Sequence, residues 1–526
     1  MSSRLARSAG LISLAILASR LLGVARESVL ASYFGASAPM DAYNVAFRIP
    51  NLLRDLFAEG AMTSAFVPAF TRVLQQRGRE EAWRLGNLVI NALLVITGTL
   101  AILGMVFAAP ITALIAPKFA QVPGKLELTT LLTQVMLPFL TTVAVAVAMM
   151  GMLNSLHRFF IPSLSPAMFN VATILCTVTL VPILRKLEWP PILAIGIGTL
   201  LGGLGQMAIQ WPVLRREGFR YRPVLDFKDP ELRRILRMMG PGTLGVAAVN
   251  INVLVNTYLA AAQQGAVSWL GYAFRLMYLP IGLFGVSIAT AALPDLSRHA
   301  SNGDDAAIRR AVSSAIRLML MLNVPAMIGL IVLAEPIVAL LYQRGHFTDA
   351  DTQATAAALR FYAPGLIGYS IVRIASPTFY SLGNSRTPVI VSVASVAVNL
   401  ILNISLVRVM GFRGLALGTA IAALFNALAL LWLLRGRLHG IEGGRVTVAF
   451  LKISGAAVVM GIVAALVAAQ LEVALPGSGE VARALRVAIA IASALVALVV
   501  SARLLRIEEF TDATERVLRR VRPARR

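Results

Sequence analysis

Residues 93–116 read LLVITGTLAILGMVFAAPITALIA, a run of 24 residues without one charged side chain. A helix of about 20 apolar residues crosses the hydrocarbon core of a bilayer, so this stretch is long enough to span a membrane. Of the 526 residues, 58% are hydrophobic and 14% are charged, which is more apolar surface than a soluble chain of this length can bury. Six further runs are similarly apolar: 131–153, 164–183, 318–341, 389–407, 453–471 and 487–504. The sequence therefore predicts an all-α polytopic membrane protein.

Weaker apolar stretches between these runs raise the expected number of transmembrane helices to about fourteen. The charges of the connecting loops test this number: with the N-terminus inside, the inner segments hold 31 Lys and Arg residues and the outer loops hold nine. This bias predicts that both termini are cytoplasmic. The expected helices are 9–33, 40–70, 86–116, 128–154, 163–184, 190–213, 236–262, 267–294, 311–341, 353–380, 388–407, 414–434, 448–471 and 484–504.

The chain contains an internal repeat at a spacing of 226–227 residues. Ala46-Phe47-Arg48 recurs as Ala273-Phe274-Arg275, and Ser155-Leu156 recurs as Ser381-Leu382. The repeat covers six helices, an even number, so both copies have the same orientation in the membrane. This predicts an N-terminal lobe (1–222), a C-terminal lobe (223–440), two additional helices (441–506) and a basic cytoplasmic tail (507–526).

Eight arginines fall inside the expected helices, where each costs about 2.5–3.5 kcal/mol at the bilayer centre. Arg317 and Arg360 lie near predicted helix ends, so their long side chains are expected to reach the headgroups. Arg20 lies in the middle of its helix and shares a face with Glu27, so it is poorly placed to do so. The eight are Arg20, Arg26, Arg48, Arg54, Arg275, Arg317, Arg360 and Arg373.

The expected helix 40–70 carries a polar stripe whose members are three or four residues apart, on one helix face. Such a stripe must line an interior, water-accessible cavity, although Pro50 is expected to kink the helix. Arg275 holds in the second copy the position of Arg48, so arginines of both lobes are expected to face this cavity. The stripe comprises Asp41, Asn44, Arg48, Asn51, Asp55 and Glu59.

More arginines than carboxylates in a cavity indicate an anionic ligand, because the guanidinium group matches phosphate oxygens. In the alternative interpretation, the carboxylates neutralise the arginines in pairs that only stabilise the bundle. The candidate substrate-binding residues are Arg20, Arg26, Glu27, Asp41, Arg48, Arg54, Glu59 and Arg275.

Three stretches resemble the MurJ (MviN) family of lipid II flippases in the MOP exporter superfamily. They are SRLLGVARE (19–27), DAYNVAFRIPNLLRDLFAEGAMTSAFVPAF (41–70) and YAFRLMYLPIGLFGVSIATAALP (272–294). The resemblance implies a V-shaped cationic cavity, with a groove for a polyprenyl tail in the last two helices. The sequence departs from the family at Glu27, where aspartate is common, and at Tyr278, where some members have an acidic residue. The family's functional residues fall on Arg20, Arg26, Asp41, Arg54 and Arg275.

The substrate implied by this resemblance is lipid II, an undecaprenyl-pyrophosphate disaccharide-pentapeptide, moved to the outer leaflet of the bacterial plasma membrane. The implied protein is a monomer among membrane lipids, with cell-wall synthesis proteins as possible partners. Some family members bind sodium, and the similar place here offers Asn252, Asn256, Asn399, Asn403 and Thr419. That set contains no carboxylate and would hold sodium weakly, so we expect no metal and no cofactor.

Other functions remain open at this stage. An exporter of drugs or of another lipid-linked oligosaccharide would use the same fold, although cationic drugs favour carboxylates in the cavity. A membrane-embedded glycosyltransferase needs a large outer loop with a catalytic carboxylate, and a non-transporting scaffold needs no buried arginines. No nucleotide-binding motif, metal-binding motif or compact basic domain is present, so neither an enzyme nor a nucleic-acid-binding protein is expected. The energy source for transport could be the membrane potential, an ion gradient or the substrate gradient.

Overall fold

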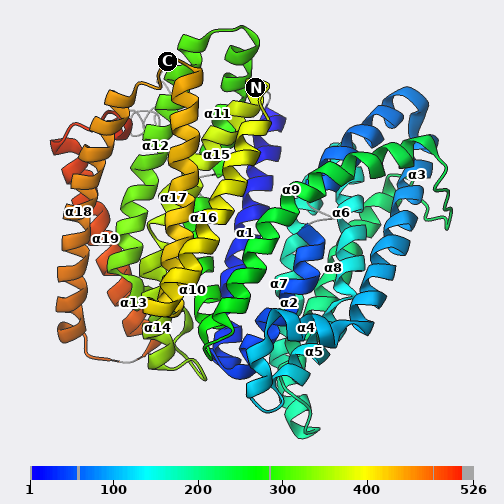
Figure 1. The fold of residues 1–526 in the computed structure, drawn as a ribbon, viewed down its shortest axis with the longest axis horizontal. Helices are drawn as coiled ribbons and strands as arrows, with labels where there is room; N and C mark the ends of the chain where they lie inside the picture. The colour runs from blue at the N-terminus through cyan, green and yellow to red at the C-terminus, as the bar shows by residue number, and fades with distance from the viewer. Residues whose placement is uncertain (1–2, 56–59, 283–285, 478, 512–526) are drawn as a thin grey trace. The chain divides into compact units, whose positions relative to one another are not determined.

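The computed structural model describes residues 3–55, 60–282, 286–477 and 479–511, and every regular element in these ranges is a helix. The helices form two compact units (Figure 1). Unit 1 comprises Met1–Ser268 and Arg344–Thr348, and unit 2 comprises Trp269–Gln343 and Asp349–Arg526. The expected lobe boundary at residue 222 follows the sequence repeat, whereas the unit boundary follows packing, and the lobe boundaries stay a prediction.

Unit 1 is a bundle in which α3 packs against α6 and α9, and α7 packs against α1 and α8. Its core gathers apolar side chains of α3, α6 and α9 with Phe219 from the loop that follows α8. The helices are α1 (Ser3–Phe34), α2 (Ala38–Arg54), α3 (Gly60–Val106), α4 (Ala108–Ile115), the 3-10 helix η2 (Pro117–Gln121), α5 (Lys125–Met136), α6 (Phe139–Ser155), α7 (Phe160–Lys186), α8 (Leu193–Arg216) and α9 (Pro230–Ala260).

Unit 2 is a bundle in which α12 packs against α11, α15 and α18, and α17 packs against α14, α15 and α16. The hairpin of α18 and α19 joins this bundle through contacts with α12 and α13. The helices are α10 (Ala266–Pro280), whose first turn belongs to unit 1, α11 (Val286–Ser301), α12 (Asp305–Val332), α13 (Ala334–Tyr342), α14 (Asp349–Tyr362), α15 (Gly365–Ser381), α16 (Arg386–Met410), α17 (Phe412–Arg437), α18 (Gly443–Ala474) and α19 (Glu480–Leu504).

The internal repeat is visible in where the helices begin. Helices α4 and α13, α6 and α15, and α7 and α16 each begin 226 residues apart. The packing repeats as well, because α3 with α6 and α7 with α8 correspond to α12 with α15 and α16 with α17. Two bundles built from a duplicated sequence, followed by the α18–α19 hairpin, are the predicted architecture.

Several expected helices are interrupted, at equivalent places in the two copies. The expected helix 128–154 is two helices, α5 and α6, because Pro138 at the break has no amide hydrogen to continue the ladder. Pro364 breaks the expected helix 353–380 in the same way, into α14 and α15. Conversely, α3 runs past the expected loop at 71–85, with Gly78 at φ +86° marking the turn between its two parts.

Nine of the described helical segments are long and apolar enough to cross a membrane. They include α7, α8, α12 and α16 to α19 as single helices. The chain is therefore a multi-pass membrane protein, and the number of fourteen spans stays a prediction.

Candidate functional site

The candidate residues of unit 1 lie on α1 and α2, which pack against α7 and α5 respectively. Helix α1 approaches α7 closely because Gly23 leaves space for Asn170, whose Nδ2 donates to the Ser19 carbonyl at 3.1 Å. This contact fixes the middle of α1, between Arg20 and Arg26. Arg20 is partly exposed, and no ion pair joins it to any residue that the structure describes.

Arg26 rests on an aromatic cluster formed by α2, α6 and α7. Its Cζ atom lies 4.9 Å from the centroid of Phe169, and Phe47 stacks on the same Phe169 at 5.9 Å. Tyr43 and Phe139 complete the cluster, which we call the aromatic cluster of unit 1. A cation over an aromatic face gains about 0.5–2 kcal/mol, the larger value when it is desolvated. The cluster therefore supports a positive charge in a mainly apolar environment.

Two of the candidate arginines pair with the carboxylate that follows them in the chain. Arg26 binds the buried Glu27, and Arg54 binds Asp55 at 2.9 Å. These pairs are the self-neutralising arrangement that the sequence left open. They do not exhaust Arg26, however, because its buried Nε donor has no hydrogen-bond partner among the described residues.

The polar stripe of α2 divides into a buried and an accessible part. Asp41 and Asn44 are buried, whereas Arg48, Asn51 and Asp55 are partly exposed. Arg48 makes an interaction of its own. The last expected member of the stripe, Glu59, lies outside the described residues.

Asp41 is enclosed by donors from three segments of unit 1. Its carboxylate accepts hydrogen bonds from the backbone amides of Gly265 and Ser268 and from the Ser268 hydroxyl, at 2.7–3.1 Å. The ammonium group of Lys125 lies 3.0 Å away, and both side chains are almost fully buried. Lys125 also stands over the ring of Phe119 at 3.9 Å. We call these groups the Asp41 cluster; it joins α2 to α5 and to the first turn of α10.

The equivalent place in unit 2 exchanges the roles of the two helices. Position 227 after Asp41 is Ser268, and position 226 after Lys125 is Asp351. In unit 2 the acid is therefore on α14, where Asp351 accepts a hydrogen bond from the indole of Trp269 on α10 at 2.9 Å. The repeat retains the link between these helices and changes its chemistry.

Arg275 lies on α10 in unit 2, partly buried, and makes an interaction of its own. Its neighbour Phe274 stacks on Tyr278 at 5.7 Å and meets Tyr362 edge-on. Arg373 of α15 donates to the Tyr278 hydroxyl at 2.6 Å. Arg373 is thus a polar group beside the candidate site that the candidate set missed, although both Arg373 and Tyr278 stood out separately in the sequence.

Two other expectations for arginines have different outcomes. Arg360 is 46% exposed and lies 3.7 Å from Glu335, as expected for a side chain that reaches the headgroups. The expectation for Arg317 was wrong, because its side chain is 16% exposed and binds Glu509 at 2.5 Å. The reason is the segment after α19, where Ile507 joins the core of unit 2 and places Glu509 beside α12.

The candidate sodium residues fall into different units. In unit 2, Asn403 donates to the Asn399 side chain at 2.8 Å, and Asn399 lies 3.4 Å from the Thr419 hydroxyl. These polar groups therefore satisfy one another. Asn252 and Asn256 lie on α9, in unit 1. Within the described ranges, no group of three or more His, Cys, Asp or Glu side chains could hold a metal ion.

Comparison with known proteins gives a consistent result. A family model described as lipid II flippase MurJ matches residues 30–477. The chain is 35% identical over 440 residues to the probable lipid II flippase MurJ of Vibrio cholerae, covering 82% of this chain and 83% of that protein. It is 36% identical over 437 residues to the corresponding Rhizobium meliloti protein, covering 81% and 79% respectively.

Solved structures show the same relationship. One titled as lipid II flippase MurJ in an inward closed conformation superimposes with a TM-score of 0.76 at 28% identity, over 94% of this chain and 99% of that one. An inward-facing MATE multidrug transporter of the MOP superfamily superimposes with a TM-score of 0.67 at 18% identity, over 81% and 96%. The second likeness concerns the fold alone.

Proposed function

Because the chain belongs to the MurJ family of lipid II flippases, we propose that it moves lipid II from the cytoplasmic to the outer leaflet of the plasma membrane by alternating access. Flippases move their substrate without changing it, so the chain is a transporter and not an enzyme. The observation that carries the proposal is Arg26, a membrane-helix arginine that rests on an aromatic cluster and retains an unused buried donor.

The proposed binding step exchanges one anion for another. Before substrate arrives, Glu27 holds Arg26 and Asp55 holds Arg54. A pyrophosphate offers more acceptor oxygens than a carboxylate and can be gripped by the planar fork of each guanidinium. Pairing with the adjacent carboxylate lowers the cost of keeping these arginines in the membrane without substrate. Arg20, Arg48 and Arg275 complete the proposed cationic set.

We assign Asp41 a positioning role in this mechanism. Its carboxylate is enclosed by protein donors, so a substrate anion would meet no free positive charge there. Asp41 instead fixes the first turn of α10, the helix that carries Arg275.

The orientation and surroundings of the chain are part of the proposal. The 31-to-9 distribution of basic residues supports cytoplasmic termini. We propose that the protein acts as a monomer beside cell-wall synthesis proteins. Export of drugs on the same fold is less well supported, since Asp41, the most buried carboxylate on α2, is already paired with Lys125.

Depletion of the protein in its host tests the function directly. We expect lipid II to accumulate on the inner leaflet, with recovery on expression of the parent chain and none with Arg26→Ala. Arg360→Ala is the matched control, because Arg360 is exposed and its ion pair is long. Accumulation of a different lipid-linked precursor, or equal complementation by both variants, would contradict the proposal.

A further inference from the structure

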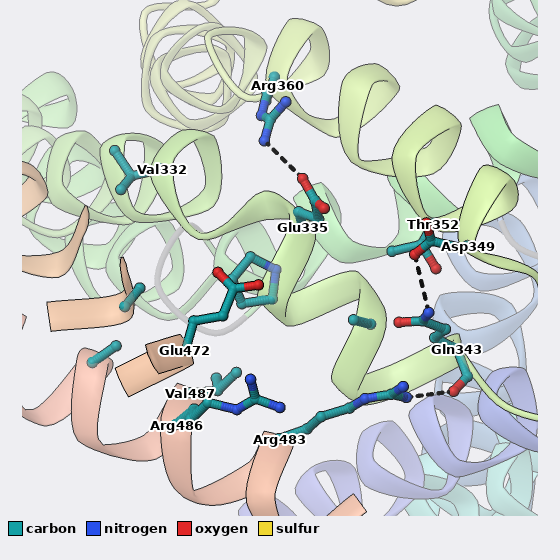
Figure 2. A pocket seen from close by; sticks show the side chains of 14 residues that line it. Val332, Glu335, Gln343, Asp349, Thr352, Arg360, Glu472, Arg483, Arg486 and Val487 are labelled. Atoms are coloured by element: carbon teal, nitrogen blue, oxygen red, sulfur yellow. Dashed lines mark hydrogen bonds and ion pairs between the residues drawn. The ribbon is translucent and has the colours of Figure 1, made fainter. Parts of the chain in front are cut away.

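Unit 2 contains a cavity of about 360 Å³ that the transport proposal does not use (Figure 2). It lies between α13 and α14 on one side and the α18–α19 hairpin on the other. Its lining residues are Val332, Glu335, Pro336, Ala339, Gln343, Asp349, Thr352, Arg360, Ala468, Glu472, Arg483, Arg486, Val487 and Ala490.

The cavity carries charges of both signs in equal number. Its three carboxylates belong to Glu335, Asp349 and Glu472, and its three guanidinium groups belong to Arg360, Arg483 and Arg486, so the formal charge is zero. An anion alone or a cation alone would leave one set of charges without a counterpart. A ligand that carries both charges fits the lining.

Most of these charges are not consumed by one another. Arg483 donates to the Gln343 carbonyl at 2.7 Å, and Arg486 donates to the Gly477 carbonyl at 2.6 Å, so both lean on neutral acceptors. In the part of the chain that the structure describes, Glu472 makes no ion pair. Figure 2 shows the Glu472 carboxylate and the Arg486 guanidinium on the same side of the cavity.

The position of the cavity along the helices makes the ligand amphiphilic. Helix α18 ends at Ala474 and α19 begins at Glu480, so the charged lining lies where two membrane-spanning helices leave the hydrocarbon. Val487 and Ala490 line the same cavity and lie about 10–15 Å further along α19, at 1.5 Å per residue. The lining therefore changes from charged to apolar in the direction of the bilayer centre.

We propose that this cavity binds the headgroup of a zwitterionic phospholipid that carries a phosphate and a primary ammonium group. Arg486 and Arg483 donate to the phosphate, and Glu472 and Glu335 accept from the ammonium. A quaternary ammonium has no N–H to donate, and an anionic headgroup supplies no cation, so both bind more weakly. The apolar lining receives the start of the acyl chains. This site does not depend on transport of lipid II.

The test uses the full-length protein in detergent, titrated by native mass spectrometry with phosphatidylethanolamine, phosphatidylcholine and phosphatidylglycerol of identical chains. Phosphatidylethanolamine is expected to bind the parent protein about tenfold more tightly than the other two. Glu472→Gln and Arg486→Gln should each weaken that binding about tenfold, which corresponds to about 1.4 kcal/mol. Arg503→Gln, an exposed change at the opposite end of α19, should leave it unchanged.

Several results would overturn the site. These are equal binding of the three lipids, tightest binding of phosphatidylglycerol, or unaltered phosphatidylethanolamine binding in both variants. Soluble glycerophosphoethanolamine is the remaining arm: binding as tight as that of the whole lipid would refute a membrane ligand. Glu472→Gln decides the matter if Arg486→Gln does not fold, because Glu472 has no ion pair to lose.

Discussion

Replacing Lys125 with methionine leaves the buried carboxylate of Asp41 without the cation that faces it. Breaking a buried ion pair from one side costs about 3–5 kcal/mol. Asp41 keeps three hydrogen bonds, from the Gly265 amide and from the amide and hydroxyl of Ser268. We therefore expect the lower end of this range, about 3 kcal/mol. The double variant Lys125→Met with Asp41→Asn removes both charges and should recover part of that loss.

Thermal unfolding of the detergent-solubilised variants, followed by intrinsic fluorescence, measures this effect. The expected order of midpoints is parent, then double variant, then Lys125→Met. Lys118→Met is the matched control, because Lys118 is exposed and lies seven residues before Lys125. A midpoint for Lys125→Met equal to that of Lys118→Met would refute the argument. So would a double variant less stable than Lys125→Met.

Four further outcomes follow from the structure. Arg26→Lys should complement a depleted strain only partly, since lysine keeps the charge and loses the planar fork, and wild-type growth would contradict this. Glu27→Gln should tighten binding of soluble pyrophosphate several-fold in a direct titration, because it removes the competing anion; weaker binding would mean that Glu27 only positions Arg26. Arg317→Ala should expose the chain near Glu509 to limited proteolysis, and a digestion pattern like the parent's would argue against the pairing. Arg222→Cys should resist an impermeant thiol reagent in intact cells while Lys118→Cys is labelled, and the reverse would overturn the topology.

Position 345 would be a poor place for such a cysteine label. Gly345 has φ +57°, and a Cβ atom there would lie 2.2 Å from the Ser32 carbonyl oxygen. The loop that contains it is held against the end of α1, where the His346 amide donates to the same carbonyl at 2.9 Å. A side chain at this position would therefore disturb the structure that it was meant to report.

The helices and the repeat could be predicted from sequence because each depends on local composition. Apolar runs mark the spans, and Pro138 and Pro364 mark breaks that a closer reading of proline would have found. The site was harder to predict. Lys125 follows Gly124 and precedes an apolar run, so its charge indicated an outer loop, and only Asp41, 84 residues earlier, explains its burial.

Interactions between distant segments account for the other differences. Arg317 was expected to reach the headgroups, but its partner Glu509 is 192 residues away, in a segment that composition alone assigned to a tail. Arg373 and Tyr278 were each unusual in the sequence, and 95 residues separate them. Spacing along one helix predicts which residues share a face, and it says nothing about which partner another helix supplies.

The Asp41 cluster also bears on the evolutionary history of the chain. After the duplication, one copy kept its acid on the first helix and a lysine on its partner, while the other placed the acid on the partner and a tryptophan on the first. A recombinant that carried α2 with α14 would bring Asp41 and Asp351 to the same junction, two acids with no base between them. The halves have therefore become complementary paralogues within one polypeptide, and exchange of segments between them is closed to later evolution.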